Sequence, residues 1–404
     1  MKISAPKQLI DYPIEVPTSK SISNRLLMMQ AMSGLGEIKD LSNAQDTQTL
    51  NALLTNMPAV MDVGHAGTAF RFLTAFLTIQ KGTYLLTGSD RMKQRPIQVL
   101  VDALRQLGAD ITYLENEGFP PLKIKGGTIL KGTIKVNARI SSQFISALMM
   151  IGPYVDNGLE IQLANEPVSK PYIEMTAQLM RGCGVEVMYT NKGISIPSGA
   201  YSFSTYTIEK DWSSIGFWCE LVVISKMSHL LIHKVTTDSI QGDREVLTLF
   251  KPLGLASHFD YKGLHLRFDE SVISKTKKSI DFTNSPDLVQ PFVATLAGIS
   301  QSQTITGIIT LKGKETDRCM ALKKELLQFG SHLAYTENKM KVKAEKFTNP
   351  QEIVKTYQDH RMAMAFAPLA FKCGELNIQN PEVVNKSYPQ YWSQLQKLGF
   401  QCTT

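Results

Sequence analysis

The chain has 404 residues, 43% hydrophobic and 20% charged, a composition typical of a globular protein. This length exceeds what one hydrophobic core usually supports, so we expect two domains of about 200 residues each. The 43 Lys and Arg against 36 Asp and Glu leave a net charge of +7, which is too modest and dispersed for a nucleic-acid-binding arm but agrees with a small, multiply anionic ligand.

Cysteine usage and targeting signals point to the cytoplasm. The five cysteines are far apart, odd in number and form no C-x-x-C pair, so the sequence predicts neither a disulfide framework nor a zinc site. Residues 1–17 contain no apolar run of the secretory kind, and no stretch approaches the roughly 20 apolar residues of a membrane span. We expect a cytoplasmic protein that binds neither a membrane nor a nucleic acid.

The first informative segment runs from Pro17 to Arg25, where three serines, a lysine and an arginine open an amphipathic helix. Unpaired N–H groups at a helix start carry the positive end of the macrodipole, so an anion placed there meets amides, hydroxyls and cations together. Ser21 and Arg25 are four residues apart and therefore share a face. An ordinary capped helix whose charged residues face water would show the same pattern of residues. This segment alone therefore does not distinguish an anion-binding helix start from an ordinary one.

A repeat of about 70 residues organises the rest of the chain. Five amphipathic segments end at a glycine, at intervals of 69 to 76 residues, and an extended apolar stretch follows the first four: Gly108, Gly184, Gly254, Gly330 and Gly399. Apolar periodicity predicts twelve helices, or six pairs, at about 20–33, 43–55, 68–80, 97–107, 142–151, 170–182, 212–225, 243–253, 286–299, 318–329, 360–372 and 388–398. Only about eight residues separate Thr55 from Gly64, so the first pair is expected to lack the β-hairpin of the other units.

Conspicuous polar residues fall mostly at the predicted helix starts. They are Lys20, Ser21, Arg25, Gly67, Thr68, Arg71, Arg95, Ser141, Ser142, Gln143, Ser169, Tyr172, Asp287, Lys314, Glu315, Arg318, His360, Arg361 and Lys386. Helix starts more often carry acids, which suit the dipole, so cations there indicate that an external anion supplies the negative charge. No nucleotide-binding glycine loop and no H-E-x-x-H pattern is present, so arginine and lysine rather than a metal are expected to meet that charge.

Nine segments, in order and across nearly the whole chain, match one family. They are 20–25 (KSISNR), 66–71 (AGTAFR), 91–97 (RMKQRPI), 141–144 (SSQF), 169–172 (SKPY), 241–243 (QGD), 314–318 (KETDR), 359–363 (DHRMA) and 385–389 (NKSYP). Together they resemble the EPSP synthases, the 3-phosphoshikimate 1-carboxyvinyltransferases of the shikimate pathway and aromatic amino acid biosynthesis.

The resemblance implies an α/β (α+β) fold of two inside-out α/β barrels. Each domain would hold three βαβαββ repeats, with helix N-termini facing an interdomain cleft. One domain would span residues 18–209 and bind mainly shikimate 3-phosphate. The other would span 210–404 with 1–17 and supply acid–base and phosphoenolpyruvate-binding residues. The crossovers near Pro17 and Lys210 would form a hinge that closes on ligand binding.

The family reaction transfers the enolpyruvyl group of phosphoenolpyruvate to the 5-hydroxyl of shikimate 3-phosphate, through a tetrahedral intermediate and without cofactor or metal. By resemblance, shikimate 3-phosphate would be held by Lys20, Ser21, Arg25, Ser141, Ser142, Gln143, Ser169, Tyr172, Asp287, Thr310 and Lys314. Phosphoenolpyruvate would be held by Lys20, Gly67, Arg95, Gln143, Arg318, Arg361 and Lys386.

Four residues are expected to act in catalysis. Proton transfer needs a base toward the attacking hydroxyl and an acid toward the methylene carbon, for which we predict Asp287 and Glu315. Lys20 would relay protons or stabilise charge, and His360 completes the set. For either carboxylate the alternative is an acid that merely satisfies a helix dipole. No exposed heptad or long apolar edge suggests assembly, so a monomer is expected.

The sequence also departs from the family pattern. His65 stands where asparagine is usual, Phe72 where proline is usual, and Thr310 where asparagine is common. The first two concern the surroundings of Gly67, and hence phosphoenolpyruvate affinity and sensitivity to glyphosate, the family inhibitor.

Three other functions are compatible with parts of this pattern. The related UDP-N-acetylglucosamine enolpyruvyl transferase usually has a cysteine in the loop before Arg95-Pro96, and residues 89–94 contain none. RNA 3′-phosphate cyclase needs a histidine motif that the chain lacks. A non-catalytic anion-binding relative would not need Lys20, Asp287, Glu315, His360 and Lys386, all of which are present.

Overall fold

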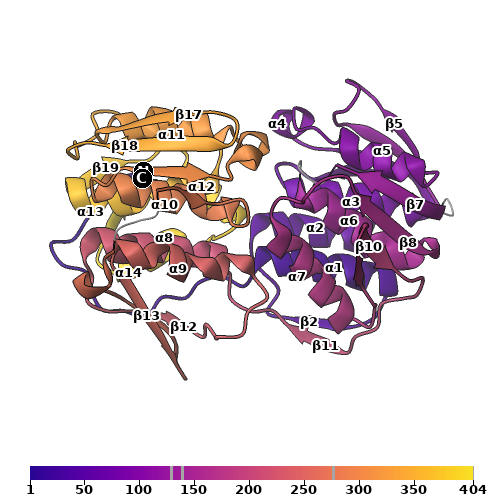
Figure 1. The fold of residues 1–404 in the computed structure, drawn as a ribbon, viewed down its shortest axis with the longest axis horizontal. Coiled ribbons are helices and arrows are strands. Elements are labelled where there is room, and N and C mark those ends of the chain that lie inside the picture. The colour runs from indigo at the N-terminus through magenta and orange to yellow at the C-terminus, as the bar shows by residue number, and fades with distance from the viewer. Residues whose placement is uncertain (128–130, 138–140, 275–277, 404) are drawn as a thin grey trace. The chain divides into compact units, whose positions relative to one another are not determined.

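The computed structural model describes residues 1–127, 131–137, 141–274 and 278–403 (Figure 1). The chain divides into two compact units: Thr18–Ile208, called here the 18–208 unit, and Met1–Pro17 with Glu209–Thr404, called the 209–404 unit. The family resemblance implies a boundary between residues 209 and 210, one residue later in the chain. No described helix has the length and apolar character that a membrane crossing would need.

The described residues of the 18–208 unit form three sheets and seven α-helices. Its strands are β2 (Glu37–Lys39), β3 (Val60–Asp62), β4 (Gly82–Thr87), β5 (Asp110–Tyr113), β6 (Leu122–Gly126), β7 (Lys131–Val136), β8 (Asp156–Leu163), β9 (Met188–Thr190), β10 (Gly193–Ile196) and β11 (Thr205–Thr207). Its helices are α1 (Lys20–Ser33), α2 (Gln45–Asn56), α3 (Gly67–Ile79), α4 (Asp90–Lys93), α5 (Gln98–Gln106), α6 (Ser142–Ile151), the 3₁₀ turn η1 (Gly152–Tyr154) and α7 (Lys170–Gly182).

The 209–404 unit is built in the same way. Its strands are β1 (Lys2–Ser4), β12 (Leu230–His233), β13 (Leu255–Asp260), β14 (Gly263–Phe268), β15 (Ile280–Asp281), β16 (Gln303–Thr306), β17 (Ser331–Tyr335), β18 (Lys339–Ala344), β19 (Glu375–Asn377) and β20 (Gln401–Thr403). Its α-helices are α8 (Trp212–Ser225), α9 (Val246–Phe250), α10 (Val289–Gly298), α11 (Arg318–Leu327), α12 (His360–Phe366), α13 (Ala370–Cys373) and α14 (Tyr391–Lys397). The 3₁₀ turns are η2 (Gly242–Glu245), η3 (Lys251–Leu253), η4 (Glu270–Val272), η5 (Pro286–Leu288), η6 (Ile309–Gly313), η7 (Ala367–Leu369) and η8 (Pro381–Lys386).

One strand pattern recurs in the sheets. An edge strand pairs in parallel with the next strand of its repeat, which pairs antiparallel with the second strand of a hairpin: β3-β4-β6-β5, β7-β8-β10-β9 and β15-β16-β18-β17. In the other two repeats a single parallel bridge takes the place of the parallel edge strand. Ile14 bridges Ile232 beside the β12-β14-β13 sheet, and Val354 bridges Ile378 beside the β19-β1-β20 sheet. The last repeat is closed by both chain ends, because β1 lies between β19 and β20.

The remaining sheet explains the irregular first repeat. β2 pairs in parallel with β11, and within residues 34–66, all described, no hairpin follows α2. The expected absence of a hairpin after Thr55 is therefore confirmed. The five repeat glycines have left-handed φ angles between 76° and 102°, and each precedes the first strand of a hairpin or its equivalent. Glycine adopts this conformation at no steric cost, which accounts for the period.

Helices rather than strands occupy the centre of each unit. In the 209–404 unit α8, α10 and α12 are buried along nearly their whole length, and Figure 1 shows them between the β12–β14 and β16–β18 sheets. In the 18–208 unit α3 and α6 are buried in the same way. These helices have apolar residues on all sides, which is typical of a helix that is covered on every face. Each unit is therefore an α/β layer with its sheets outside.

Several helix predictions needed correction. The helix expected at 243–253 is broken into η2, α9 and η3, because Pro252 interrupts the pattern. The helix expected at 97–107 is α5, which begins one residue later, at Gln98. The helix expected from 388 begins at Tyr391, and the short α4 was not predicted.

Candidate active site

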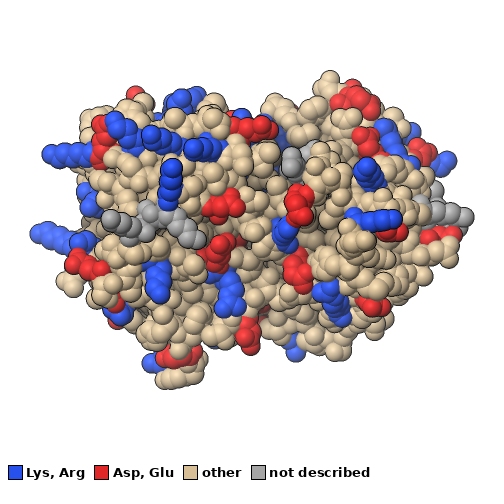
Figure 2. All heavy atoms as spheres, viewed as in Figure 1, with Lys and Arg blue, Asp and Glu red and all other residues tan. Residues whose placement is uncertain are grey.

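The candidate arginines are buried and are not part of a charged surface. On the face drawn in Figure 2, Lys and Arg are interspersed with Asp and Glu. By contrast, Arg25, Arg71, Arg95, Arg318 and Arg361 are all buried. Buried cations are rare unless they are paired or bind something, so their partners are the informative feature. Among the described residues, no group of three or more His, Cys, Asp or Glu is arranged to hold a metal ion.

The start of α1 is a capped helix with a lysine at its first position. Ser19 is the N-cap, and its hydroxyl accepts a hydrogen bond from the Ile22 backbone N–H. Lys20 Nζ lies 2.9 Å from a carboxylate oxygen of Asp46, which is in the first turn of α2. The sequence analysis did not single out Asp46, because an acid in the first turn of a helix is ordinary.

Arg25 connects three helices, α1, α6 and α7. Its guanidinium donates to the Ser21 carbonyl at 2.9 Å, to Ser146 Oγ on α6 at 3.2 Å and to Thr176 Oγ1 on α7 at 2.7 Å. A longer bond of 3.4 Å reaches the Tyr172 carbonyl. All these acceptors are neutral. Burial consequently lowers the pKa of Arg25 to about 10.

A second group forms at the starts of α3 and α6. Gln143 Nε2 donates to Thr68 Oγ1 at 3.2 Å, and Ser141 caps α6 through the Gln143 N–H. A Cβ atom on Gly67 would collide with the guanidinium of Arg95, so glycine is required for Arg95 to approach this helix start. Backbone donors, an amide and a guanidinium thus meet at Gly67.

The start of α7 has an unusual backbone. Ser169 adopts a left-handed conformation with φ of 54°, and it is buried. Non-glycine residues with this conformation are uncommon and often lie at binding sites. Ser142 is also buried, at the first residue of α6.

In the 209–404 unit Asp287 is bound by three cations. Arg361 donates to its side chain and backbone at 3.0 Å each, Arg318 Nη1 to its carboxylate at 2.9 Å, and Lys314 Nζ at 3.3 Å. Burial by itself would raise the pKa of Asp287, but these three charges outweigh it and hold the pKa well below its usual value.

Arg318 is the centre of this network. Besides Asp287, its guanidinium donates to Glu315 at 3.0 Å and to Asp359 at 2.8 Å. Burial would lower the pKa of Arg318, yet Asp359, Glu315 and Asp287 together raise it. Asp359 also caps α12 by accepting from the Arg361 N–H. Asp359 is not among the predicted site residues, although it begins the 359–363 segment, because nothing in the sequence pairs it with Arg318.

Among the other predicted residues, His360 lies beside this network, whereas Thr310 and Lys386 lie apart from it. His360 is buried with its Nδ1 3.8 Å from Asp359. Thr310 lies in η6 and Lys386 at the end of η8, and within the described ranges neither has a hydrogen bond or ion pair to the Asp287 network. The expectation that Lys386 opens a helix is wrong, because it closes a 3₁₀ turn before α14.

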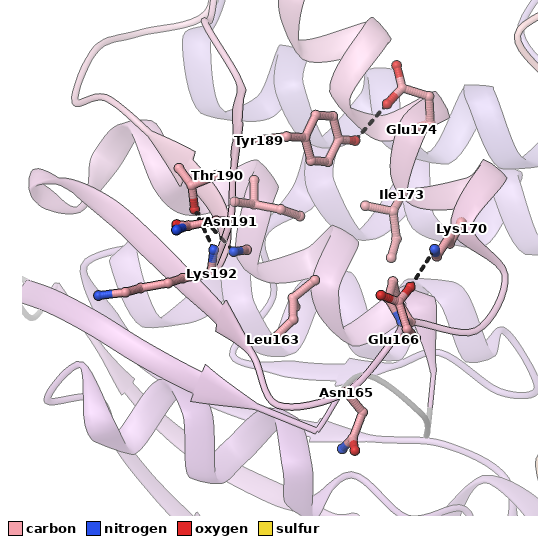
Figure 3. Close-up of a pocket in the computed structure, with 13 residues that line it drawn as sticks. Leu163, Asn165, Glu166, Lys170, Ile173, Glu174, Tyr189, Thr190, Asn191 and Lys192 are labelled. Carbon is pink, nitrogen blue, oxygen red and sulfur yellow. Dashed lines mark hydrogen bonds and ion pairs between the residues drawn. The ribbon is translucent and has the colours of Figure 1, made fainter.

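A separate pocket lies on the 18–208 unit (Figure 3). Its volume is about 460 Å³, and Leu163, Ile173 and Ile194 contribute apolar surface while Lys170 and Glu174 contribute charge. Residues 170, 173 and 174 face the pocket, whereas residues 172 and 176 of the same helix contact Arg25. The pocket and the Arg25 cluster therefore use different faces of α7.

Comparison with known proteins decides the family. The sequence model for EPSP synthase (3-phosphoshikimate 1-carboxyvinyltransferase) matches residues 28–395. The chain belongs to the EPSP synthase family. A 3-phosphoshikimate 1-carboxyvinyltransferase of Bacteroides fragilis (strain YCH46) is 41% identical over 403 residues, covering 98% of this chain and 97% of the relative. That of Sulfurovum sp. (strain NBC37-1) is 33% identical and covers 98% of both chains.

A solved structure shows the same fold. The EPSP synthase from Acinetobacter baumannii superposes with a TM-score of 0.77 over the full length of both chains, at 20% sequence identity. This confirms the α/β fold class.

The departures from the usual family sequence have local explanations. The Phe72 ring lies under the Arg25 guanidinium, 5.3 Å from its centre. His65 Nδ1 lies 3.0 Å from Ser89 Oγ, at the start of α4. Phe72 therefore supports a site cation by a cation–π contact, and His65 connects the loop before α3 to the loop before α4.

Proposed function

We infer that this protein is an enzyme that transfers the enolpyruvyl group of phosphoenolpyruvate to the 5-hydroxyl of shikimate 3-phosphate and releases phosphate. The observation behind this is the family match together with relatives of that name aligned over 98% of the chain. Neither the UDP-N-acetylglucosamine enzyme nor a non-catalytic relative is favoured.

We propose that the 18–208 unit binds mainly shikimate 3-phosphate. Arg25 has only neutral acceptors among the described residues, so its charge is available to a phosphate. Helix-start hydroxyls and amides of the same unit would complete the site: Lys20, Ser21, Ser141, Ser142, Gln143, Ser169 and Tyr172. From the other unit, Asp287, Thr310 and Lys314 would contact the acceptor.

Phosphoenolpyruvate carries a carboxylate and a phosphate, which arginine forks bind in two-point fashion. We propose that Arg95 beside Gly67, with Lys20 and Gln143, meets one end of this donor. Arg318, Arg361 and Lys386 would meet the other. Arg318 uses three of its five N–H groups on carboxylates, so one N–H on each of Nη1 and Nη2 remains for the donor.

The proposed chemistry moves two protons. Asp287 removes the proton of the 5-hydroxyl, whose oxygen bonds to C2 of the donor while Glu315 protonates the methylene carbon. In the second step Glu315 takes a proton back from the methyl carbon while phosphate leaves C2 with the proton held by Asp287, which gives the product and restores both carboxyl groups. Lys20 and His360 would stabilise or relay charge. Each step transfers a proton or a group and needs no oxidant.

Two further properties belong to the same proposal. We expect the enzyme to act as a monomer in the cytoplasm. The support for the location is that all five cysteines are free in the described structure.

The test is phosphate release by the pure protein. With phosphoenolpyruvate and shikimate 3-phosphate, we expect turnover and equimolar enolpyruvyl product. Turnover with UDP-N-acetylglucosamine instead would identify the protein as a UDP-N-acetylglucosamine enolpyruvyl transferase. No turnover with either acceptor would favour a non-catalytic, anion-binding relative.

A further inference from the structure

The segment Gln241–Glu245 has no part in the proposed substrate contacts, yet it is firmly attached to the start of α8. The Gln241 side chain makes three hydrogen bonds. Its carbonyl accepts from the Trp212 N–H at 3.2 Å, and its amide donates to the Lys210 carbonyl at 2.7 Å and to Glu209 at 2.9 Å. These partners follow directly after the chain enters the 209–404 unit at Glu209.

The other end of this segment reaches the stretch that holds Asp287. Ser285 Oγ donates to the Glu245 carboxylate at 3.2 Å, and Ser285 is the N-cap of η5, which contains Asp287. Gln241–Glu245 therefore connects the entry point of the unit to the proposed base. Between the two attachments lies Asp243.

Asp243 is a buried carboxyl, with 2% of its surface exposed. Ser213 Oγ, in the first turn of α8, donates a short hydrogen bond to it. Charged groups from three other places act on it: Asp211 before α8, Asp287 in η5 and Arg361 in α12. Burial raises the pKa of Asp243 to about 6, the charge of Asp287 reinforces this, and Ser213 and Arg361 oppose it.

The proposed role of Asp287 as a base would be favoured by a second negative charge nearby. Arg361, Lys314 and Arg318 hold its pKa low, which makes it a weak base, and Glu315 offsets them only in part. A second negative charge nearby increases the proton affinity of a carboxylate. We propose that Asp243 is a positioning residue for the reaction: when ionised, it offsets the cations around Asp287 and strengthens Asp287 as the base toward the acceptor hydroxyl. This inference rests on the proposed function.

The test is the pH dependence of kcat between pH 5 and 9 for the wild type, Asp243→Asn and Ser213→Ala. Wild-type kcat should rise through the range near pH 6 in which Asp243 ionises. Asp243→Asn should lack this rise and be about 10-fold slower at pH 8, with both KM values within about threefold. Ser213→Ala keeps the carboxyl but loses a hydrogen bond that favours its ionised form, so the rise should move to higher pH.

Asp238→Asn is the matched control, because Asp238 is an exposed carboxylate on the loop before this segment. It should keep the wild-type profile. A wild-type profile in Asp243→Asn would overturn the inference. So would an equal loss of rate and melting temperature in Asp243→Asn and Ser213→Ala, which would mean that the pair only supports the fold. Absence of wild-type turnover at pH 8 would overturn the proposed function and this role with it.

Discussion

Two arginines of this protein are equally buried but differently paired. Arg25 in the 18–208 unit is 2% exposed, and Arg318 in the 209–404 unit is 1% exposed. The hydrogen bonds of Arg25 end on hydroxyl and carbonyl oxygens, whereas those of Arg318 end on Asp287, Glu315 and Asp359. The pKa of Arg25 is lowered to about 10 by burial, and that of Arg318 is raised by its three carboxylates.

The difference separates two tasks. A buried cation without a carboxylate partner is stabilised when an anion arrives, so Arg25 is suited to bind a phosphate. Arg318 belongs to a network in which Lys314, Arg318 and Arg361 face Asp287, Glu315 and Asp359. Such a balanced network would hold proton-transferring carboxylates in place, and we propose that the 18–208 unit mainly binds the acceptor while the 209–404 unit mainly supplies the acid and the base.

The largest expected effect is on stability, from Arg318→Ala. Removing this guanidinium leaves the buried Asp359 and the partly buried Asp287 and Glu315 without it, which should lower the unfolding free energy by about 3–5 kcal/mol. Urea denaturation measures this value. Arg25→Ala removes only neutral contacts and serves as the comparison, with an expected loss of about 1–3 kcal/mol. Equal losses would break the distinction between the two arginines.

The next effect is on catalysis. Glu315→Ala and Lys20→Ala should each reduce kcat at least about 100-fold, the scale of acid–base catalysis. Steady-state phosphate release gives the rates, and a thermal melt confirms that each variant folds. Asp317→Ala changes the neighbouring N-cap of α11 without removing a proposed catalytic group. It should keep kcat within about threefold while losing roughly 1 kcal/mol of stability. Near-wild-type rates in Glu315→Ala would show that the acid is misassigned.

The smallest effect concerns a buried carboxyl group that, among the described residues, has neither a neutral nor a charged hydrogen-bond partner. Glu220 on α8 is fully buried, and neither carboxyl oxygen has a hydrogen-bond partner in the described structure. Burial raises its pKa well above the usual value. The folded state therefore binds the Glu220 proton more tightly, and this stabilising contribution is lost as pH rises above the unfolded pKa.

Compared with Glu220→Gln, the wild type should lose unfolding free energy as pH rises above about 5, by at most about 1.4 kcal/mol per pH unit. Parallel stability curves for the two proteins would contradict this. Glu375→Gln, at an exposed strand position, should leave the wild-type pH dependence unchanged.

Much of the fold could be predicted from local signals. The glycines at positions 108 to 399 revealed the repeat because left-handed turns require that residue, and the short spacing after Thr55 revealed the missing hairpin. The closure of the last repeat by β1 could not be predicted, because Ile3 pairs with Leu376 and Cys402, far along the chain.

The candidate site could also be predicted only in part. Cations at helix starts were evident from residue type and position. Their partners were not, since Ser146 and Thr176 lie inside helices and meet Arg25 only when α6 and α7 pack against α1. The three carboxylates around Arg318 likewise come from three separate segments.

The most direct test of this division is the Kd of shikimate 3-phosphate without phosphoenolpyruvate, measured by isothermal titration calorimetry for Arg25→Lys and Arg318→Lys. Lysine keeps the charge but loses the fork of donors. We predict that Arg25→Lys weakens binding about 10- to 100-fold, while Arg318→Lys leaves Kd within about threefold and instead raises the KM for phosphoenolpyruvate. The reverse pattern, or equal weakening in both variants, would contradict the account.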